Sequence, residues 1–104
     1  MASHPTQYTL APSEEDRISF EFKTEKNKVK YFIIQYYAKT PKGWRTIRRY
    51  DCAHGYLHIH TFGFSRKKAK RTEAIEGDYN QLFTELRKQV LENLRKIKEN
   101  YLFQ

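Results

Sequence analysis

The stretch Trp44–Phe62, WRTIRRYDCAHGYLHIHTF, decides the fold that we predict for this chain. It contains two runs typical of strands, joined by the short connection 52–55. Successive side chains of a strand point to opposite faces of the sheet. His58 and His60 therefore share one face, while the neighbouring apolar residues Leu57 and Ile59 share the other. We expect the apolar side to face the core. The two histidines would then lie together on the open side of the sheet.

The flanking sequence predicts two earlier strands and one later helix. Residues 17–23 alternate apolar with polar side chains, and residues 29–38 are largely apolar on both faces, which indicates a central strand. Downstream, Asp78 is a candidate helix N-cap, and apolar residues then recur at helical spacing as far as Tyr101. The predicted fold is therefore α+β: an antiparallel four-stranded β-meander with one long C-terminal helix packed on one face, the strands being 17–23, 29–38, 44–51 and 56–62.

The domain organisation follows from composition. Residues 1–16 carry two prolines and no apolar periodicity, so we predict a mobile N-terminal arm ahead of a single domain at 17–104. The basic run 66–71 repels itself too strongly for a sheet interior, which favours a loop or an extension of the last strand. The sequence shows no apolar run of membrane-spanning length and no signal-peptide core, so we expect a cytoplasmic protein that does not associate with membranes.

Positive charge is concentrated in one third of the chain. Between Lys39 and Thr72 there are ten Lys or Arg residues and one acid, Asp51, which gives a net charge of +9 for this segment. Concentrated charge interleaved with aromatic side chains favours RNA or another nucleic acid as the partner, although an acidic protein partner or a merely solvated surface has the same composition. The candidate nucleic-acid-binding residues are Arg45, Arg48, Tyr50, Tyr56, Arg66, Lys67, Lys68, Lys70 and Arg71.

Three of the four histidines form the pattern His-x3-His-x-His at His54, His58 and His60. These histidines and Asp51 could act as general acid and base, while Arg48 or Arg49 stabilises charge on a phosphoryl group. Such a set could cleave RNA without a metal, because the 2′-hydroxyl is an internal nucleophile. The alternative is a site for zinc or another divalent metal at the same three histidines. The surrounding positive charge argues against that alternative. A third interpretation is that the histidines only line a polar sheet face.

The residues Arg49-Tyr50-Asp51-Cys52-Ala53 and the His-rich segment after them, followed by a C-terminal helix, resemble the TumE-like family of small prokaryotic toxin–antitoxin components. This chain has Cys52 where that family often has Asn, and its basic run after Phe62 also differs. The resemblance implies a toxin-like role, action on RNA and an antitoxin partner. The residues that it implicates are Arg49, Asp51, His54, His58 and His60.

The sequence therefore predicts a toxin-like RNA-binding protein that is a metal-independent ribonuclease and needs no cofactor. Two alternatives stay open: a non-catalytic nucleic-acid-binding module, and a His-rich metal-binding protein or metal-dependent enzyme. The catalytic proposal depends on the imidazoles and guanidiniums gathering on one open surface; if they do not, a plain electrostatic binder is the interpretation that remains. The alternation of side chains along residues 44–51 does not by itself show which side of that strand faces the helix.

Overall fold

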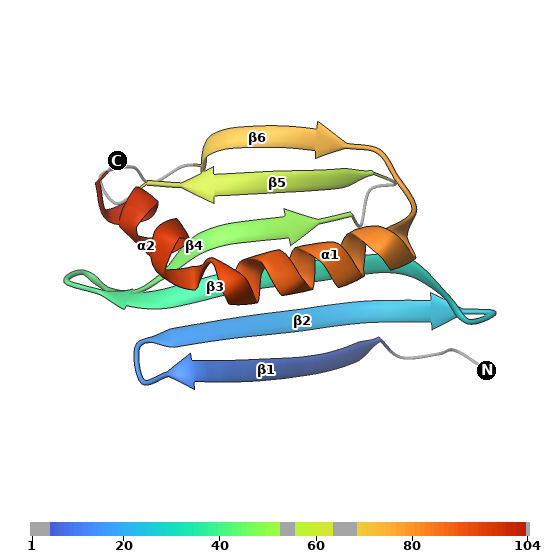
Figure 1. The fold of residues 1–104 in the computed structure, drawn as a ribbon, viewed down its shortest axis with the longest axis horizontal. Helices are drawn as coiled ribbons and strands as arrows, with labels where there is room; N and C mark the ends of the chain where they lie inside the picture. The colour runs from blue at the N-terminus through green and yellow to red at the C-terminus, as the bar shows by residue number, and fades with distance from the viewer. Residues whose placement is uncertain (1–4, 53–55, 64–68, 104) are drawn as a thin grey trace.

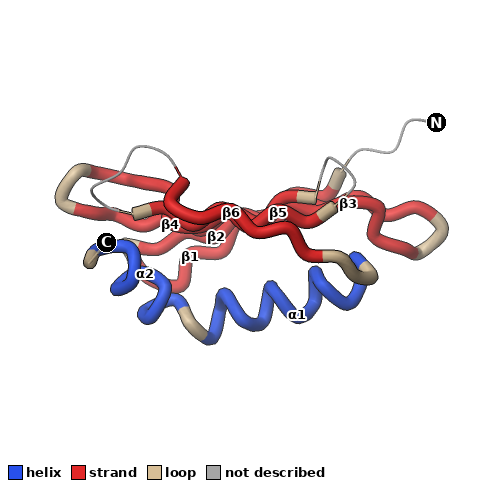
Figure 2. The backbone as a smooth tube through the Cα atoms, turned by 90° about the horizontal axis from the view of Figure 1, so that it is seen from above, coloured by secondary structure: helices blue, strands red, loops and turns tan. Residues whose placement is uncertain are grey.

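The computed structural model describes residues 5–52, 56–63 and 69–103. They form a six-stranded antiparallel sheet in the order β1-β2-β3-β4-β5-β6, with two helices packed on one side (Figures 1 and 2). The elements are β1 (Thr6–Ser13), β2 (Asp16–Glu25), β3 (Lys28–Thr40), β4 (Gly43–Asp51), β5 (Leu57–Phe62), β6 (Ala69–Ile75), α1 (Tyr79–Glu92) and α2 (Leu94–Leu102).

The prediction of a four-stranded meander under one long helix was wrong. The sheet gains a strand at each edge, and the helical segment is broken into two. The four expected strands correspond to β2–β5, and two of the predicted turns are tight hairpins. At one of them, Lys26 and Asn27 have φ of 53° and 64°, and at the other Gly43 has φ of 95°. Asn and Gly tolerate these left-handed conformations better than other residues do.

The first additional strand is β1, which replaces most of the predicted mobile arm. It pairs with β2 from Thr6 to Ser13, and Tyr8 stacks on Phe20 with ring centroids 4.8 Å apart. Only two of its side chains, Tyr8 and Leu10, pack against the core. An edge strand has one free side and therefore tolerates proline, so Pro12 does not prevent pairing. With two apolar positions and two nearby prolines, this segment alternates apolar and polar residues too weakly for the sequence to predict a strand.

The second additional strand is β6, which overlaps the end of the basic run. Its backbone pairs with β5, from Leu57 opposite Ile75 to Phe62 opposite Ala69. Charge repulsion within the basic run predicts a loop or an extension of the last strand, and neither of these is a separate paired strand. At the free edge of a sheet, however, charged residues are common, because that edge borders solvent.

The helical segment breaks at Asn93. This residue has φ of −121° and ψ of 20°, outside the helical region, and its side-chain Nδ2 donates to the carbonyl oxygen of Gln89 at 2.8 Å. The break changes the direction of the chain, so that α1 runs along β3 and α2 turns toward β4 (Figure 1). The apolar stripe continues across the break, with Leu86 and Val90 buried on α1 and Ile97 and Tyr101 buried on α2.

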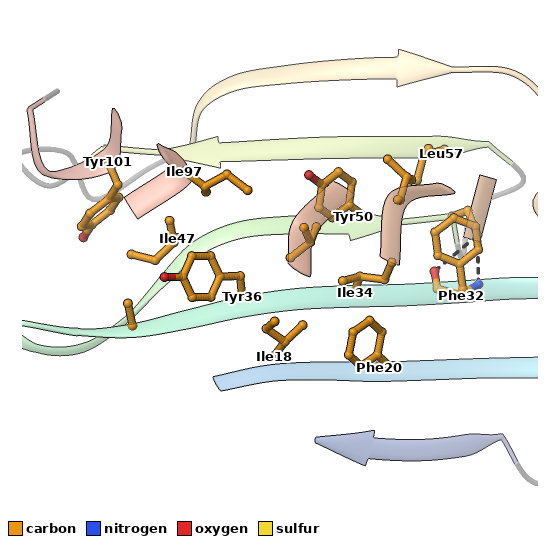
Figure 3. Packing of buried hydrophobic residues seen from close by; sticks show 14 residues of the cluster. Ile18, Phe20, Phe32, Ile34, Tyr36, Ile47, Tyr50, Leu57, Ile97 and Tyr101 are labelled. Carbon is orange, nitrogen blue, oxygen red and sulfur yellow. Dashed lines mark hydrogen bonds between the residues drawn. The ribbon is translucent and has the colours of Figure 1, made fainter. Parts of the chain in front are cut away.

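The core lies between the helices and one face of the sheet (Figure 3). A bulge in β4 decides how that strand contributes. The Cα of Tyr36 pairs with Arg48 and that of Tyr37 pairs with Thr46, so Ile47 is an extra residue and is 1% exposed. The fully buried large side chains of the core are Tyr36, Phe20, Phe32, Ile18, Ile34, Ile47, Leu57, Val90 and Cys52. Among the described residues, no helix lies over the face of the sheet opposite α1 and α2, as Figure 2 shows, and we call this the open face.

Candidate phosphate site on the open sheet face

The strand register brings four of the five predicted catalytic residues together. Asp51 is the direct cross-strand partner of His58, and Arg49 is the partner of His60. On the other side of β4, Gln35 of β3 pairs with Arg49. Neighbouring strands lie about 4.8 Å apart, so these side chains form a compact group on one face. We call Arg49, Asp51, His58 and His60 the phosphate cluster.

The guanidinium of Arg49 is held in place from two sides. Its Nη2 and Nε donate to Oδ2 of Asp51 at 3.0 and 3.3 Å, and its Nη1 donates to Oε1 of Gln35 at 3.2 Å. Gln35 is in turn fixed because its Nε2 donates to Oγ1 of Thr46 at 2.9 Å. The Arg49 side chain is still 37% exposed, whereas that of Asp51 is 16% exposed. An anion arriving on this face therefore meets a preoriented cation that solvent can still reach.

The two imidazoles lie parallel to each other. The ring centroids of His58 and His60 are 5.9 Å apart and their planes differ by 7°. Tyr56 packs on the other side of His58 with a centroid distance of 4.1 Å, and it is 45% exposed. Both histidines are half-buried. The two parallel imidazoles and the exposed Tyr56 ring form a row on the open face, in which Nε2 of His58 is itself buried and only the rest of its ring can meet a ligand.

A hollow of about 410 Å³ opens on the same face, next to the cluster. Arg49 forms part of its wall, together with Gln35, Tyr37 and Ile33 of β3 and Glu21 of β2. It is shallow and mixed in polarity. This hollow leaves room for a planar group beside the guanidinium of Arg49.

Several predicted nucleic-acid-binding residues lie elsewhere. Arg48 and Tyr50 alternate with Arg49 along β4 and therefore face the helices. Tyr50 is 3% exposed, so its ring is not available to stack on a base. Arg45 pairs with the buried Ala38 and lies near Tyr101, again on the helix side. The alternation of side chains along β4 and its bulge thus place these three residues on the face opposite Arg49.

The structure does not describe the side chains of the other predicted site residues. His54, Arg66, Lys67 and Lys68 lie outside the described residues. Lys70 and Arg71 lie in the part of β6, residues 69–74, for which only the backbone is described. Their predicted roles stay predictions.

Cys52 is built into the core. Its Sγ accepts a hydrogen bond from the backbone nitrogen of Phe32 at 3.0 Å and donates to the carbonyl oxygen of the same residue at 3.3 Å, as the dashed lines in Figure 3 mark. Burial raises the pKa of the Cys52 thiol. A thiol that is 1% exposed and held protonated is a poor nucleophile.

Sequence reasoning missed the residues that support Arg49. Gln35 and Thr46 lie on neighbouring strands, and their contact with Arg49 depends on the β3–β4 register. Because residues 29–38 are apolar on both faces, no pattern marked the face that carries Gln35 as the open one.

Within the part of the chain that the structure describes, no three His, Cys, Asp or Glu side chains group closely enough to hold a metal ion. The metal alternative needs His54, which lies outside that part. Among the same residues, no helix combines the length and apolar character needed to span a membrane.

Comparison with known proteins gives one assignment. The domain of unknown function DUF7718 matches residues 3–104, nearly the whole chain. The chain belongs to the DUF7718 family. No curated protein and no solved structure matches it significantly. The fold and the cluster described above are therefore those of a DUF7718 domain, and the resemblance to TumE-like toxins stays a prediction.

Proposed function

We propose that this protein binds RNA and cleaves it without a metal, through the phosphate cluster. The observation that supports this best is the β4–β5 register, in which Arg49 lies opposite His60 and Asp51 lies opposite His58 on the open face. A guanidinium that binds an anion, next to two groups able to exchange protons, is the minimal set for transesterification of a phosphodiester.

The proposed step is an internal displacement at phosphorus. One imidazole accepts the proton of the 2′-hydroxyl, whose oxygen attacks the adjacent phosphorus and forms a 2′,3′-cyclic phosphate. The other imidazole, in its protonated form, donates its proton to the leaving 5′-oxygen, so protons and charge balance. Arg49 stabilises the negative charge that develops on the phosphoryl oxygens, and Asp51 orients Arg49 through its two hydrogen bonds.

Binding would use the same face. Tyr56 is exposed beside His58 and offers a ring for base stacking, while the hollow next to Arg49 has room for a neighbouring base. The concentration of charge between Lys39 and Thr72 supports phosphate binding in general. Cellular RNA as the substrate goes with a cytoplasmic location, which is part of this proposal.

A cleavage assay tests the proposal. Total RNA is incubated with the protein in EDTA, and the variants His58→Ala and His60→Ala are compared with Arg95→Ala, a matched loss of one cation on the exposed side of α2. We expect each histidine variant to lose at least about a hundredfold in rate, as is usual for an acid or base, while still binding RNA. Cleavage that both histidine variants retain would refute the proposal. Salt-sensitive binding by wild-type protein without cleavage would favour the non-catalytic module.

The toxin-like role with an antitoxin partner is a further part of the proposal. It predicts that production of the protein in a bacterial host slows growth and that His58→Ala relieves the effect. A gene for a small protein that binds this chain would be expected next to its own gene. Unchanged growth with soluble, folded wild-type protein would contradict the toxin role but not the cleavage chemistry.

A further inference from the structure

A groove on the helix side of the sheet has no part in the proposed cleavage. Its volume is about 560 Å³, within the range of small-molecule sites, and it lies between the helices and strands β4 and β5. In Figure 1 the helices run over β3 and β4, while β5 and β6 lie beside them without a helix in front. The groove is therefore on the face opposite the phosphate cluster.

The two ends of the groove differ in chemistry. At one end the lining is apolar and includes Leu82 of α1, Ile59 of β5 and Ile75 of β6. At the other end are Arg48 and Gln89, the latter seven residues along from Leu82 and therefore about 10 Å further on the helix. The groove thus has an apolar end and a polar end that carries a cation, with Glu85 of α1 in the lining between them.

Arg48 has no counter-ion among the side chains that the structure describes. Its Nε is buried and has no hydrogen-bond partner among the residues that the structure describes, and its one hydrogen bond there runs from Nη1 to the hydroxyl of Tyr50 at a long 3.4 Å. The acid in the lining, Glu85, accepts from Gln81 instead. A buried N–H group such as this Nε is costly when it has no hydrogen-bond partner, and an anion bound to the guanidinium would lower that cost.

The break between the helices enlarges the polar end. A second hollow of about 290 Å³ shares Arg48 with the groove and is lined by Asn93, Lys96 and Asn100. An unbroken helix would not turn α2 toward β4 at this point. The polar end therefore combines two cations with side-chain amides, a set that recognises oxygen anions.

We infer that this groove binds an amphipathic carboxylate, with its carboxylate on Arg48 and its hydrocarbon chain along the apolar lining toward Leu82. The planar fork of a guanidinium matches a carboxylate. A small inorganic anion would leave the apolar end unfilled, and a neutral hydrocarbon would leave Arg48 without a counter-ion. Both parts of the ligand are needed to satisfy both parts of the groove.

Calorimetric titration of the full-length protein tests this inference with three probes: octanoate, acetate and 1-octanol. We expect saturable binding of octanoate, with acetate and octanol each at least about tenfold weaker. Amide chemical shifts of the wild-type protein should change at Thr61, Leu82 and Gln89 and stay constant at Ser19 and Glu21, which line the hollow on the opposite face. Equal binding of acetate would reduce the groove to surface charge, equal binding of octanol would reduce it to an apolar surface, and absence of saturation would exclude it.

Two arginine variants on the same strand provide the matched comparison. Arg48→Met should weaken octanoate binding at least about tenfold, because it removes the cation while keeping an apolar side chain of similar length. Arg45→Met, an exposed position outside the groove lining, should leave the affinity within about twofold. Equal affinities of the two variants would overturn the inference, and if Arg48→Met does not fold, the shift map of the wild-type protein decides.

Discussion

The hydroxyl of Tyr36 shows how single residues couple this fold to pH. It donates a hydrogen bond to Oδ1 of Asp16, and burial, aided by this bond and the nearby carboxylate, raises the pKa of Tyr36 far above its ordinary value of 10.0. The folded protein therefore retains this proton at a pH where the unfolded chain has released it. The stabilisation is fully present below about pH 10 and is lost as the pH rises further.

Tyr36→Phe separates the two consequences of this hydroxyl. At pH 7 we expect the variant to lose about 1–2 kcal/mol in free energy of unfolding, because Asp16 loses its donor. Between pH 10 and about 11.5 its stability should fall less steeply than that of the wild type, since one titrating group is gone. Urea unfolding at several pH values measures both. Parallel curves for the two proteins would contradict this assignment.

Cys52 gives a second prediction at this scale. Its thiol is 1% exposed and its pKa is raised by burial, so the native protein should react with a disulfide reagent at pH 8 at least about a hundredfold more slowly than the unfolded chain. A spectrophotometric thiol assay with and without urea checks this. Rapid native reaction would return Cys52 to the list of candidate nucleophiles.

At the scale of elements, the start of α1 is fixed by its cap. Oδ2 of Asp78 accepts from the backbone nitrogen of Gln81 at 3.2 Å, whereas the Gln81 side chain turns away to Glu85 and does not complete a capping box. Asp78→Ala should therefore cost about 1 kcal/mol in free energy of unfolding, and Gln81→Ala should cost at most a few tenths. Urea denaturation of the two variants measures the difference, and equal costs would argue that the cap contributes nothing.

The elements also show where the sequence was informative. Strong alternation or helical periodicity, as at Ile18-Phe20-Phe22 and along α1, predicted elements that the structure contains. The helix break at Asn93 was not visible because the apolar stripe continues across it. The edge strands were missed because an edge strand needs fewer apolar residues than a central one, and the β4 bulge was missed because a single extra residue leaves no pattern.

At the scale of the whole molecule, the alternation of side chains along the strands places the charged residues on two opposite faces of the sheet. Arg49 and Arg48 are neighbours in sequence but lie on opposite sides of the sheet, one in the phosphate cluster and the other in the groove under the helices. Composition treated the basic segment as one surface, whereas the strand register separates it into two. The sequence predicted that His58 and His60 lie on the same face of their strand. Their pairing with Asp51 and Arg49 depends on the β4–β5 register, which the sequence does not show.

The Arg49–Asp51 pair provides a test of the open face that does not require activity. Because Asp51 is mostly buried and Arg49 only partly so, Arg49→Met should lower the free energy of unfolding by about 1 kcal/mol, and the added change Asp51→Asn should recover part of that loss. A double-mutant cycle by urea denaturation measures the coupling. Strictly additive effects would mean that Asp51 does not hold Arg49.

The most direct test of the account is the chemistry of the cleaved ends. An RNA oligonucleotide and a DNA oligonucleotide of the same sequence are incubated in EDTA with wild-type protein and with His58→Ala, and the products are identified by mass spectrometry. The account predicts 2′,3′-cyclic phosphate ends from RNA, intact DNA, and at least a hundredfold slower cleavage by the variant. Cleavage of the DNA, or RNA products that the wild type and His58→Ala form at the same rate, would contradict it.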